Sequence, residues 1–214
     1  MQGVNTLFYV LVLIMSVVVH EMAHGFAAES QGDPTARYAG RLSLNPLKHI
    51  DPVGSVLLPL LLVFFKTGFV IGWAKPVPYD ERNLRDPRWG TLLVASAGIL
   101  VNIGLAVIFG VSIRFAYLLG SAAPAFVSIA AVITEVNIVL ALFNLIPIPP
   151  LDGSRVMAWL LPDSMRSAYL AIERFGIVIV AFLLYGNTGF SRMLSSTINA
   201  VYFWMYDLLP FGRA

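Results

Sequence analysis

Three ionisable side chains stand at the end of a long apolar run near the start of the chain. Residues 4–19 are almost uniformly apolar, and the motif HEMAH follows directly, with His20, Glu21 and His24 as its ionisable members. A helix needs about 20 residues to cross a bilayer, so these side chains fall inside a membrane or just beneath its far side. Polar groups at that depth are costly and usually line a functional cavity.

The spacing of these residues predicts a metal site. Residues four apart on a helix share a face, so His20 and His24 can reach one metal ion. Glu21 lies beside that face, where it can accept a proton from a water molecule bound to the metal. An accidental HExxH on a solvated helix is the alternative, which the apolar flanks disfavour. Catalytic zinc usually has three protein ligands, so we expect one zinc ion per chain and a third ligand from elsewhere.

The composition places the chain in a membrane. Of its 214 residues, 58% are hydrophobic and 12% are charged, whereas a soluble domain has about a quarter charged residues. We therefore expect an all-α polytopic protein of the cell membrane. The net charge of +2 is too small to indicate nucleic acid, and the lack of cysteine excludes thiolate ligands and a cysteine nucleophile. The N-terminus lacks the basic region of a cleavable signal peptide, so we expect the first helix to be retained.

The apolar segments predict about five to six transmembrane helices. The first should end near Ser30, before a Gly-Asp-Pro sequence. Weak strand character is expected at residues 36–44. The later spans are expected at residues 89–115, 124–146 and 168–185, and the aromatic-rich residues 193–209 suit an interface or a last crossing.

Other residues could supply the third metal ligand, and three of them are poor choices. Glu29 is five residues past His24 and lies off the metal-binding face. His49 and Asp51 lie in a basic loop, where a solvated or interfacial pair is the simpler reading.

Glu135 and Asp152 are the stronger alternatives for this ligand. Glu135 lies within a span, but Asn137 and Asn144 are seven residues apart and share a helical face that Glu135 does not share with Asn144. If the asparagines line the site, Glu135 faces away. Asp152 follows a helix broken by prolines, and irregular backbone at membrane depth is tolerated against a cavity. Asp152 could equally be the N-cap of a short helix over residues 151–161.

Two motifs together resemble the site-2 protease family of intramembrane zinc metalloproteases. HEMAHG occurs in a first transmembrane helix, and NLIPIPPLDG occurs at residues 144–153. The second motif in this order is far more specific than HExxH alone, and the resemblance covers most of the chain. It implies a single intramembrane metalloprotease domain over residues 1–214, in a compact form without a PDZ or CBS domain.

The resemblance also implies roles for individual residues. His20, His24 and Asp152 would bind zinc, Glu21 would be the general base, and Asn144 would contact the substrate near the scissile bond. Two further residues are candidates for the site. Asn102 lies four residues after a glycine that relatives often follow with proline, and this chain departs from them with isoleucine at that place. Asn137 shares a helical face with Asn144.

The implied substrate is a membrane protein cut in or near a transmembrane segment, as in regulated intramembrane proteolysis. A helical substrate must unwind first, and residues 74–79 could hold it. Pro76 and Pro78 leave one edge of an extended segment without donors, while Lys75, Val77 and Tyr79 keep theirs for strand addition. A rigid polyproline-like loop without a partner is the alternative.

Two competing functions remain open. The chain could be a membrane zinc peptidase that acts on soluble peptides, or a non-catalytic metal transporter or scaffold. A transporter has no need of a glutamate between two metal ligands, so the peptidase readings are favoured.

Residues 53–73 are expected to enter the membrane and return without crossing. The segment is short and interrupted by Pro59. A crossing here would also put Asp152 on the wrong side for a shared metal. Without a crossing, nine basic residues lie on the same side of the membrane, and the positive-inside rule predicts that this side is cytoplasmic. The N-terminus is then outside, and the active site is approached from the cytoplasmic side. The nine basic residues on the cytoplasmic side are Arg37, Arg41, Lys48, Lys75, Arg82, Arg85, Arg88, Arg155 and Arg166.

Overall fold

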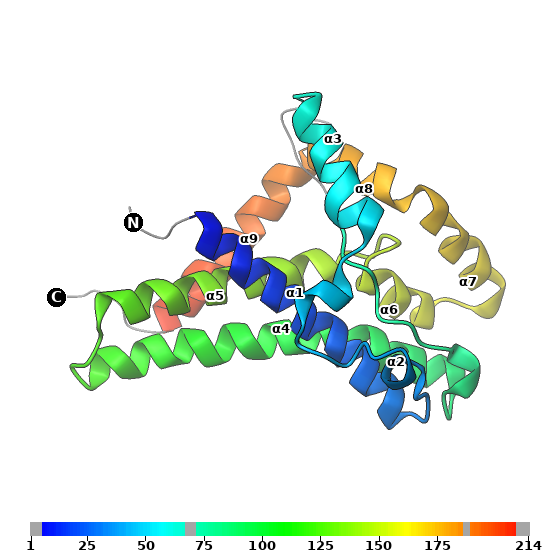
Figure 1. Ribbon diagram of the computed structural model, residues 1–214, viewed down its shortest axis with the longest axis horizontal. Helices are drawn as coiled ribbons and strands as arrows, with labels where there is room; N and C mark the ends of the chain where they lie inside the picture. Colours follow the sequence, from blue (N-terminus) through cyan, green and yellow to red (C-terminus); the bar gives the residue numbers. More distant parts are fainter. Residues whose placement is uncertain (1–5, 67–71, 186–188, 209–214) are drawn as a thin grey trace.

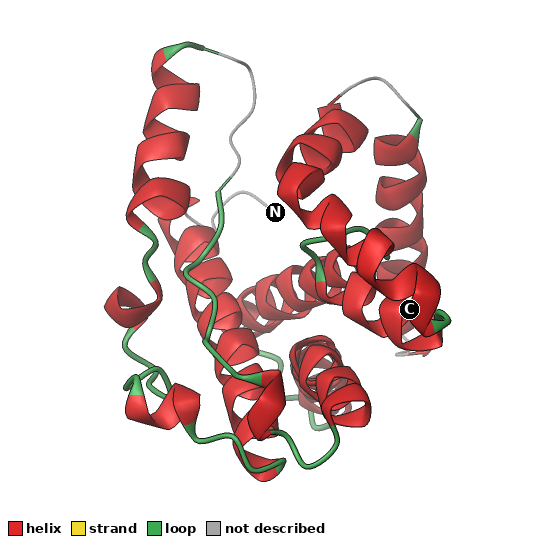
Figure 2. Cartoon of the chain, turned by 90° about the vertical axis from the view of Figure 1, so that its right-hand side faces the viewer, coloured by secondary structure: helices red, strands yellow, loops and turns green. Residues whose placement is uncertain are grey.

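The computed structural model describes residues 6–66, 72–185 and 189–208, and in these ranges it contains helices and loops but no strand (Figure 2). The predicted all-α class is confirmed. The α-helices in chain order are α1 (Thr6–Ser30), α2 (Thr35–Tyr38), α3 (Leu58–Phe64), α4 (Pro87–Leu118), α5 (Pro124–Asn144), α6 (Asp152–Leu160), α7 (Asp163–Leu170), α8 (Gly176–Tyr185) and α9 (Phe190–Leu208). Shorter helical turns are η1 (Pro46–His49), η2 (Pro52–Leu57), η3 (Glu81–Asn83) and η4 (Ala171–Phe175).

Four helical stretches are long and apolar enough to cross a membrane. Three of them are α1, α4 and α5, which begin or end within a few residues of the predicted spans. The fourth comprises α7, η4 and α8. Helix α9 is long enough but carries more polar residues, so the count of five to six spans stays a prediction.

At the centre of the molecule, α1 packs against α4 and α5 (Figure 1). Val12 of α1 meets Val132 and Val136 of α5 in one buried cluster. Ala28 near the end of α1 meets Val94 of α4 in another. These three helices therefore form the scaffold on which the polar residues of the first motif are held.

The weak strand expected at residues 36–44 is wrong. The chain makes one helical turn, α2, and then reverses at Gly40, whose φ is +63°. The Arg41 N–H donates to Ala36 O, so this stretch satisfies its backbone locally and has no strand partner. Glycine adopts this left-handed conformation without the steric cost that a side chain would add.

The segment that follows forms a hairpin-like excursion from the bundle. The chain rises through η2 and α3, and residues 72–80 return as an extended stretch (Figure 1). Residues 67–71, within the segment predicted to enter the membrane and return, lie outside the described residues. The two arms meet at their base, where Trp73 N–H donates to Gly54 O at 3.2 Å and Lys75 N–H donates to His49 O at 2.9 Å. The start of the outgoing arm and the end of the returning arm are therefore adjacent.

We call residues 73–80 the return segment, which lies between α1 and α6 (Figure 1). Its end is fixed by Asp33, a fully buried residue just after α1. Asp33 accepts hydrogen bonds from Asp80 N–H at 2.7 Å and from Asn83 Nδ2 at 2.9 Å. Burial acts to raise the pKa of Asp33, but hydrogen bonds from Thr35, Asn83 and Asp80 outweigh it and hold this pKa below its usual value. The carboxylate therefore stays ionised where it ties the return segment to α1.

Candidate metal centre and active site

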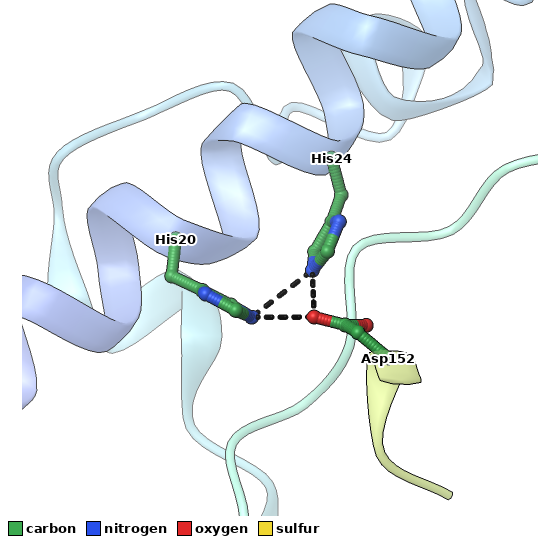
Figure 3. A group of neighbouring side chains, drawn as sticks. All are labelled: His20, His24 and Asp152. Atoms are coloured by element: carbon green, nitrogen blue, oxygen red, sulfur yellow. Dashed lines mark hydrogen bonds and ion pairs between the residues drawn. The ribbon is translucent and has the colours of Figure 1, made fainter. Parts of the chain in front are cut away.

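Two imidazoles and one carboxylate converge between α1 and the start of α6 (Figure 3). Asp152 Oδ2 lies 3.1 Å from His20 Nε2 and 3.3 Å from His24 Nε2. The two Nε2 atoms are 3.1 Å apart. His20 and His24 are 6% and 9% exposed. Three side chains from two distant parts of the sequence therefore aim one atom each at a common point.

The break after α5 delivers Asp152 to this point. Prolines at 147, 149 and 150 prevent α5 from continuing, and α6 begins at Asp152. The N-cap of α6 is Leu151 and not Asp152, and Asp152 Oδ2 has no hydrogen-bond partner. A Cβ on Gly153 would lie 2.3 Å from Leu145 O, so glycine permits α6 to start directly against the end of α5. The Asp152 carboxylate is thus free to face α1.

The outer nitrogens of both imidazoles are bound to acceptors on α4. His24 Nδ1 lies 2.8 Å from Val94 O, and His20 Nδ1 lies 2.6 Å from Asn102 Oδ1. A carbonyl oxygen only accepts, so His24 Nδ1 carries the proton and its Nε2 presents a lone pair. The same follows for His20 if the Asn102 oxygen faces it.

A chain of amides fixes that orientation of Asn102. Asn102 Nδ2 donates to Asn137 Oδ1 at 2.7 Å. Asn137 Nδ2 in turn donates to Ile133 O at 2.8 Å and to Ser16 Oγ at 3.0 Å. Ile133 O cannot donate, so the order of donors along the chain is set. Asn102 and Asn137 are fully buried, and they orient His20 from behind.

This arrangement fits a bound cation. Two nitrogen lone pairs and a carboxylate oxygen face one another, and Asp152 Oδ2 is buried without a hydrogen-bond partner. Acceptors held this close repel one another unless a positive charge lies between them. Among the residues that the structure describes, this is the one group of histidines and carboxylates that could hold a metal ion. Fold and cluster together define a membrane protein with a metallohydrolase-type centre.

Glu21 points to the return segment. Its Oε2 accepts a hydrogen bond from the Val77 N–H at 2.8 Å. Lys75 N–H is bonded to His49 O, and the Tyr79 hydroxyl lies 3.2 Å from Arg155 Nη1. The edge predicted to bind substrate therefore has two of its backbone donors engaged within the protein. Its role in binding substrate stays a prediction.

Asn144 lies at the end of α5. Its Nδ2 donates to Leu140 O at 3.0 Å, back into its own helix. The contact between Asn144 and a substrate therefore stays a prediction.

The rejected ligand candidates have other partners. Glu29 pairs with Arg37 on the surface, and Asp51 caps η2 by accepting from the Val53 and Gly54 N–H groups. His49 Nε2 lies 2.9 Å from Ser43 O.

Glu135 also lies apart from the metal cluster. It lies near Tyr9, eleven residues before His20 on α1, and is not among the residues of the cluster. This agrees with the helical-face argument that separated it from the site.

Sequence reasoning missed the role of Gly98. A Cβ there would lie 2.5 Å from His20 Cε1 and 2.6 Å from His24 Cε1, so both imidazoles rest against the bare backbone of α4. Gly98 and Asn102 are four residues apart, and Ser16 is four before His20. This helical spacing is the signal that could have joined them to the site.

Comparisons with known proteins point to one family. Residues 113–186 match peptidase family M50. A Bacillus subtilis protein named "Putative zinc metalloprotease YwhC" is 36% identical over 198 residues, covering 90% of this chain and 86% of that protein. Proteins named "Putative zinc metalloprotease Rip2" from Mycolicibacterium smegmatis and Mycobacterium tuberculosis are 29% and 27% identical, each covering 91% of this chain and 71% of the relative. No solved structure matches.

The chain therefore belongs to peptidase family M50, the site-2 protease family. It is a multi-pass membrane zinc metalloprotease, and the expected zinc cofactor and protease class are confirmed.

Replacing Gly98 with alanine should impair zinc binding. The new methyl group would displace both imidazoles, and we expect zinc affinity to fall by about 10- to 100-fold, as for other changes behind metal ligands. Gly104→Ala on the same helix is the matched control, because a Cβ there meets nothing within 4 Å. Metal analysis of the purified variants measures the effect. Equal zinc content in the two variants would contradict the close packing at Gly98.

Proposed function

We propose that this protein is an intramembrane endopeptidase that hydrolyses a peptide bond in or near a transmembrane segment of a membrane protein. The observation that carries the proposal is the depth of the His20–His24–Asp152 cluster. At about 1.5 Å per residue, the two histidines lie about 21 and 27 Å along α1 from Thr6. The hydrocarbon core of a bilayer is about 30 Å thick. A site at this depth favours a substrate that is itself in the membrane.

His20, His24 and Asp152 would hold the zinc ion, leaving a fourth position open. When bound, zinc acts as a Lewis acid and makes water a nucleophile at neutral pH. Glu21 would accept the proton of the attacking water and deliver it to the leaving amine. The Asn144 amide has one Nδ2 hydrogen bonded to Leu140 O, and it would donate the other to the substrate near the scissile bond.

The substrate strand would bind beside the return segment. Tyr79 and the exposed side chain of Lys75 lie on this segment and remain proposed contacts, together with Val77. Pairing at the backbone of Lys75 or Val77 would require their present hydrogen bonds to open, since both donors are engaged.

Loss of the proposed base should abolish cleavage without loss of metal. Glu21→Gln keeps all three ligands, so we expect the turnover number on a single-span substrate in liposomes to fall by about 10²- to 10⁴-fold with zinc content unchanged. Glu29→Gln is the control, since Glu29 lies on the same helix and pairs with Arg37. Turnover near the wild-type rate in Glu21→Gln would exclude Glu21 as the base. Cleavage confined to peptides without a membrane segment would exclude the intramembrane substrate.

The active site would be reached from the cytoplasmic side. The joined arms of the 52–73 excursion support a return without crossing, because Trp73 and Gly54 are hydrogen-bonded. Helices α4 and α5 would then cross once each, which leaves α6 on the same side as the end of α1. The basic residues on that side make it cytoplasmic and place the N-terminus outside.

Cysteine labelling tests this topology directly, because the chain has no native cysteine. The variants are Lys48→Cys, Arg82→Cys, Ser121→Cys and Ser164→Cys, all at exposed positions. We expect an impermeant thiol reagent to label only the variant at position 121 in intact cells, and all four after permeabilisation. Labelling of the variant at position 82 in intact cells would mean that the excursion crosses the membrane.

A further inference from the structure

The return segment offers Glu21 one backbone donor. Pro76 and Pro78 have no N–H, so over residues 76–78 the Val77 N–H is the single amide donor. That donor lies 2.8 Å from Glu21 Oε2, and the two residues are 56 apart in the sequence. Nothing local forces this contact, so the tertiary structure brings the two groups together.

The Val77 side chain is held against α1. It is 6% exposed, whereas Pro76 and Pro78 on either side are exposed. A Cβ on Gly25 would lie 3.0 Å from Val77 Cγ1 and 2.5 Å from Leu42 Cδ2. Gly25 is one helical turn after Glu21, on the same face of α1. The bare backbone at Gly25 thus lets Val77 approach closely enough for its N–H to reach the carboxylate.

The backbone around Val77 is fixed on both sides. Before it, the buried guanidinium of Arg41 donates to Lys75 O at 2.5 Å and to Pro76 O at 3.3 Å. After it, the buried carboxylate of Asp33 binds Asp80 N–H. A charged group is costly to bury, yet two of them hold this short stretch. Such fixing is expected where the direction of one backbone group matters.

We propose that the Val77 backbone N–H is the positioning group for Glu21. It binds one carboxylate oxygen, Oε2, and so restricts the three side-chain torsions of a residue that would otherwise sample many rotamers. The second oxygen then serves proton transfer at the metal centre. This inference rests on the proposed role of Glu21 as general base, and it assigns Val77 to the base rather than to the substrate. One N–H cannot fully serve both.

Kinetics separate the two roles of Val77. A donor that orients the base acts on the chemical step and changes kcat, whereas a donor that pairs with substrate changes KM when chemistry is slow. Val77→Pro and Val77→Ala form a matched pair, because both lose packing of the isopropyl group and only the proline variant loses the N–H. Their comparison cancels most of the packing effect.

In full-length zinc-loaded protein, we expect Val77→Pro to have a kcat about 10- to 100-fold below that of Val77→Ala, with the same KM and zinc content. Equal kcat values would overturn the proposal. So would a rise in KM alone, which would return Val77 to the substrate edge.

Hydrogen exchange of the Val77 amide tests the contact even if the proline variant does not fold. We expect this amide to stay protected in Glu21→Gln, whose side chain can still accept, and to exchange at least about tenfold faster in Glu21→Leu, which cannot. Equal protection in both variants would overturn the proposal. Cleavage by Glu21→Gln is a separate measurement. If this variant still cleaves substrate, Glu21 is not the general base, and the proposed function fails at that point. The hydrogen bond between Val77 and Glu21 is tested by exchange alone.

Discussion

Three buried atoms, the Nε2 atoms of two histidines and one oxygen of Asp152, meet at one point, where they could hold a metal ion. The elements around them hold these three side chains in place. Helix α4 supplies acceptors that fix both imidazole tautomers, and Gly98 gives the rings room. The proline break after α5 places Asp152 opposite α1. These polar groups lie on or next to helices that are long and apolar enough to cross a membrane, where polar groups need partners within the protein.

The return segment connects this centre to the loops outside it. Asp33 and Arg41 are both buried and charged, and both bind its backbone rather than a carboxylate–guanidinium partner. The segment lies between α1 and α6, the two helices that carry the proposed metal ligands (Figure 1). A structure that fixes this stretch therefore also limits how a substrate strand can approach Glu21.

The sequence predicted the parts of the site that depend on local periodicity. The i, i+4 spacing of His20 and His24 and the proline break before Asp152 are local signals, and the three residues do converge. Contacts between distant segments could not be read in this way. The packing of Gly98 on the imidazoles and the bond from Val77 to Glu21 depend on how separate elements pack. The weak strand at residues 36–44 failed because local hydrogen bonds and the reversal at Gly40 satisfied the backbone.

X-ray absorption at the zinc edge tests the central claim most directly, because it counts imidazole ligands on the metal. The chain has three histidines, and the third, His49, has its Nε2 bonded to Ser43 O. For purified zinc-loaded protein, the structure predicts two imidazole nitrogens at about 2.0–2.1 Å and oxygen ligands at about 2.0–2.2 Å. A spectrum that requires one imidazole or three would contradict a centre built from His20, His24 and Asp152.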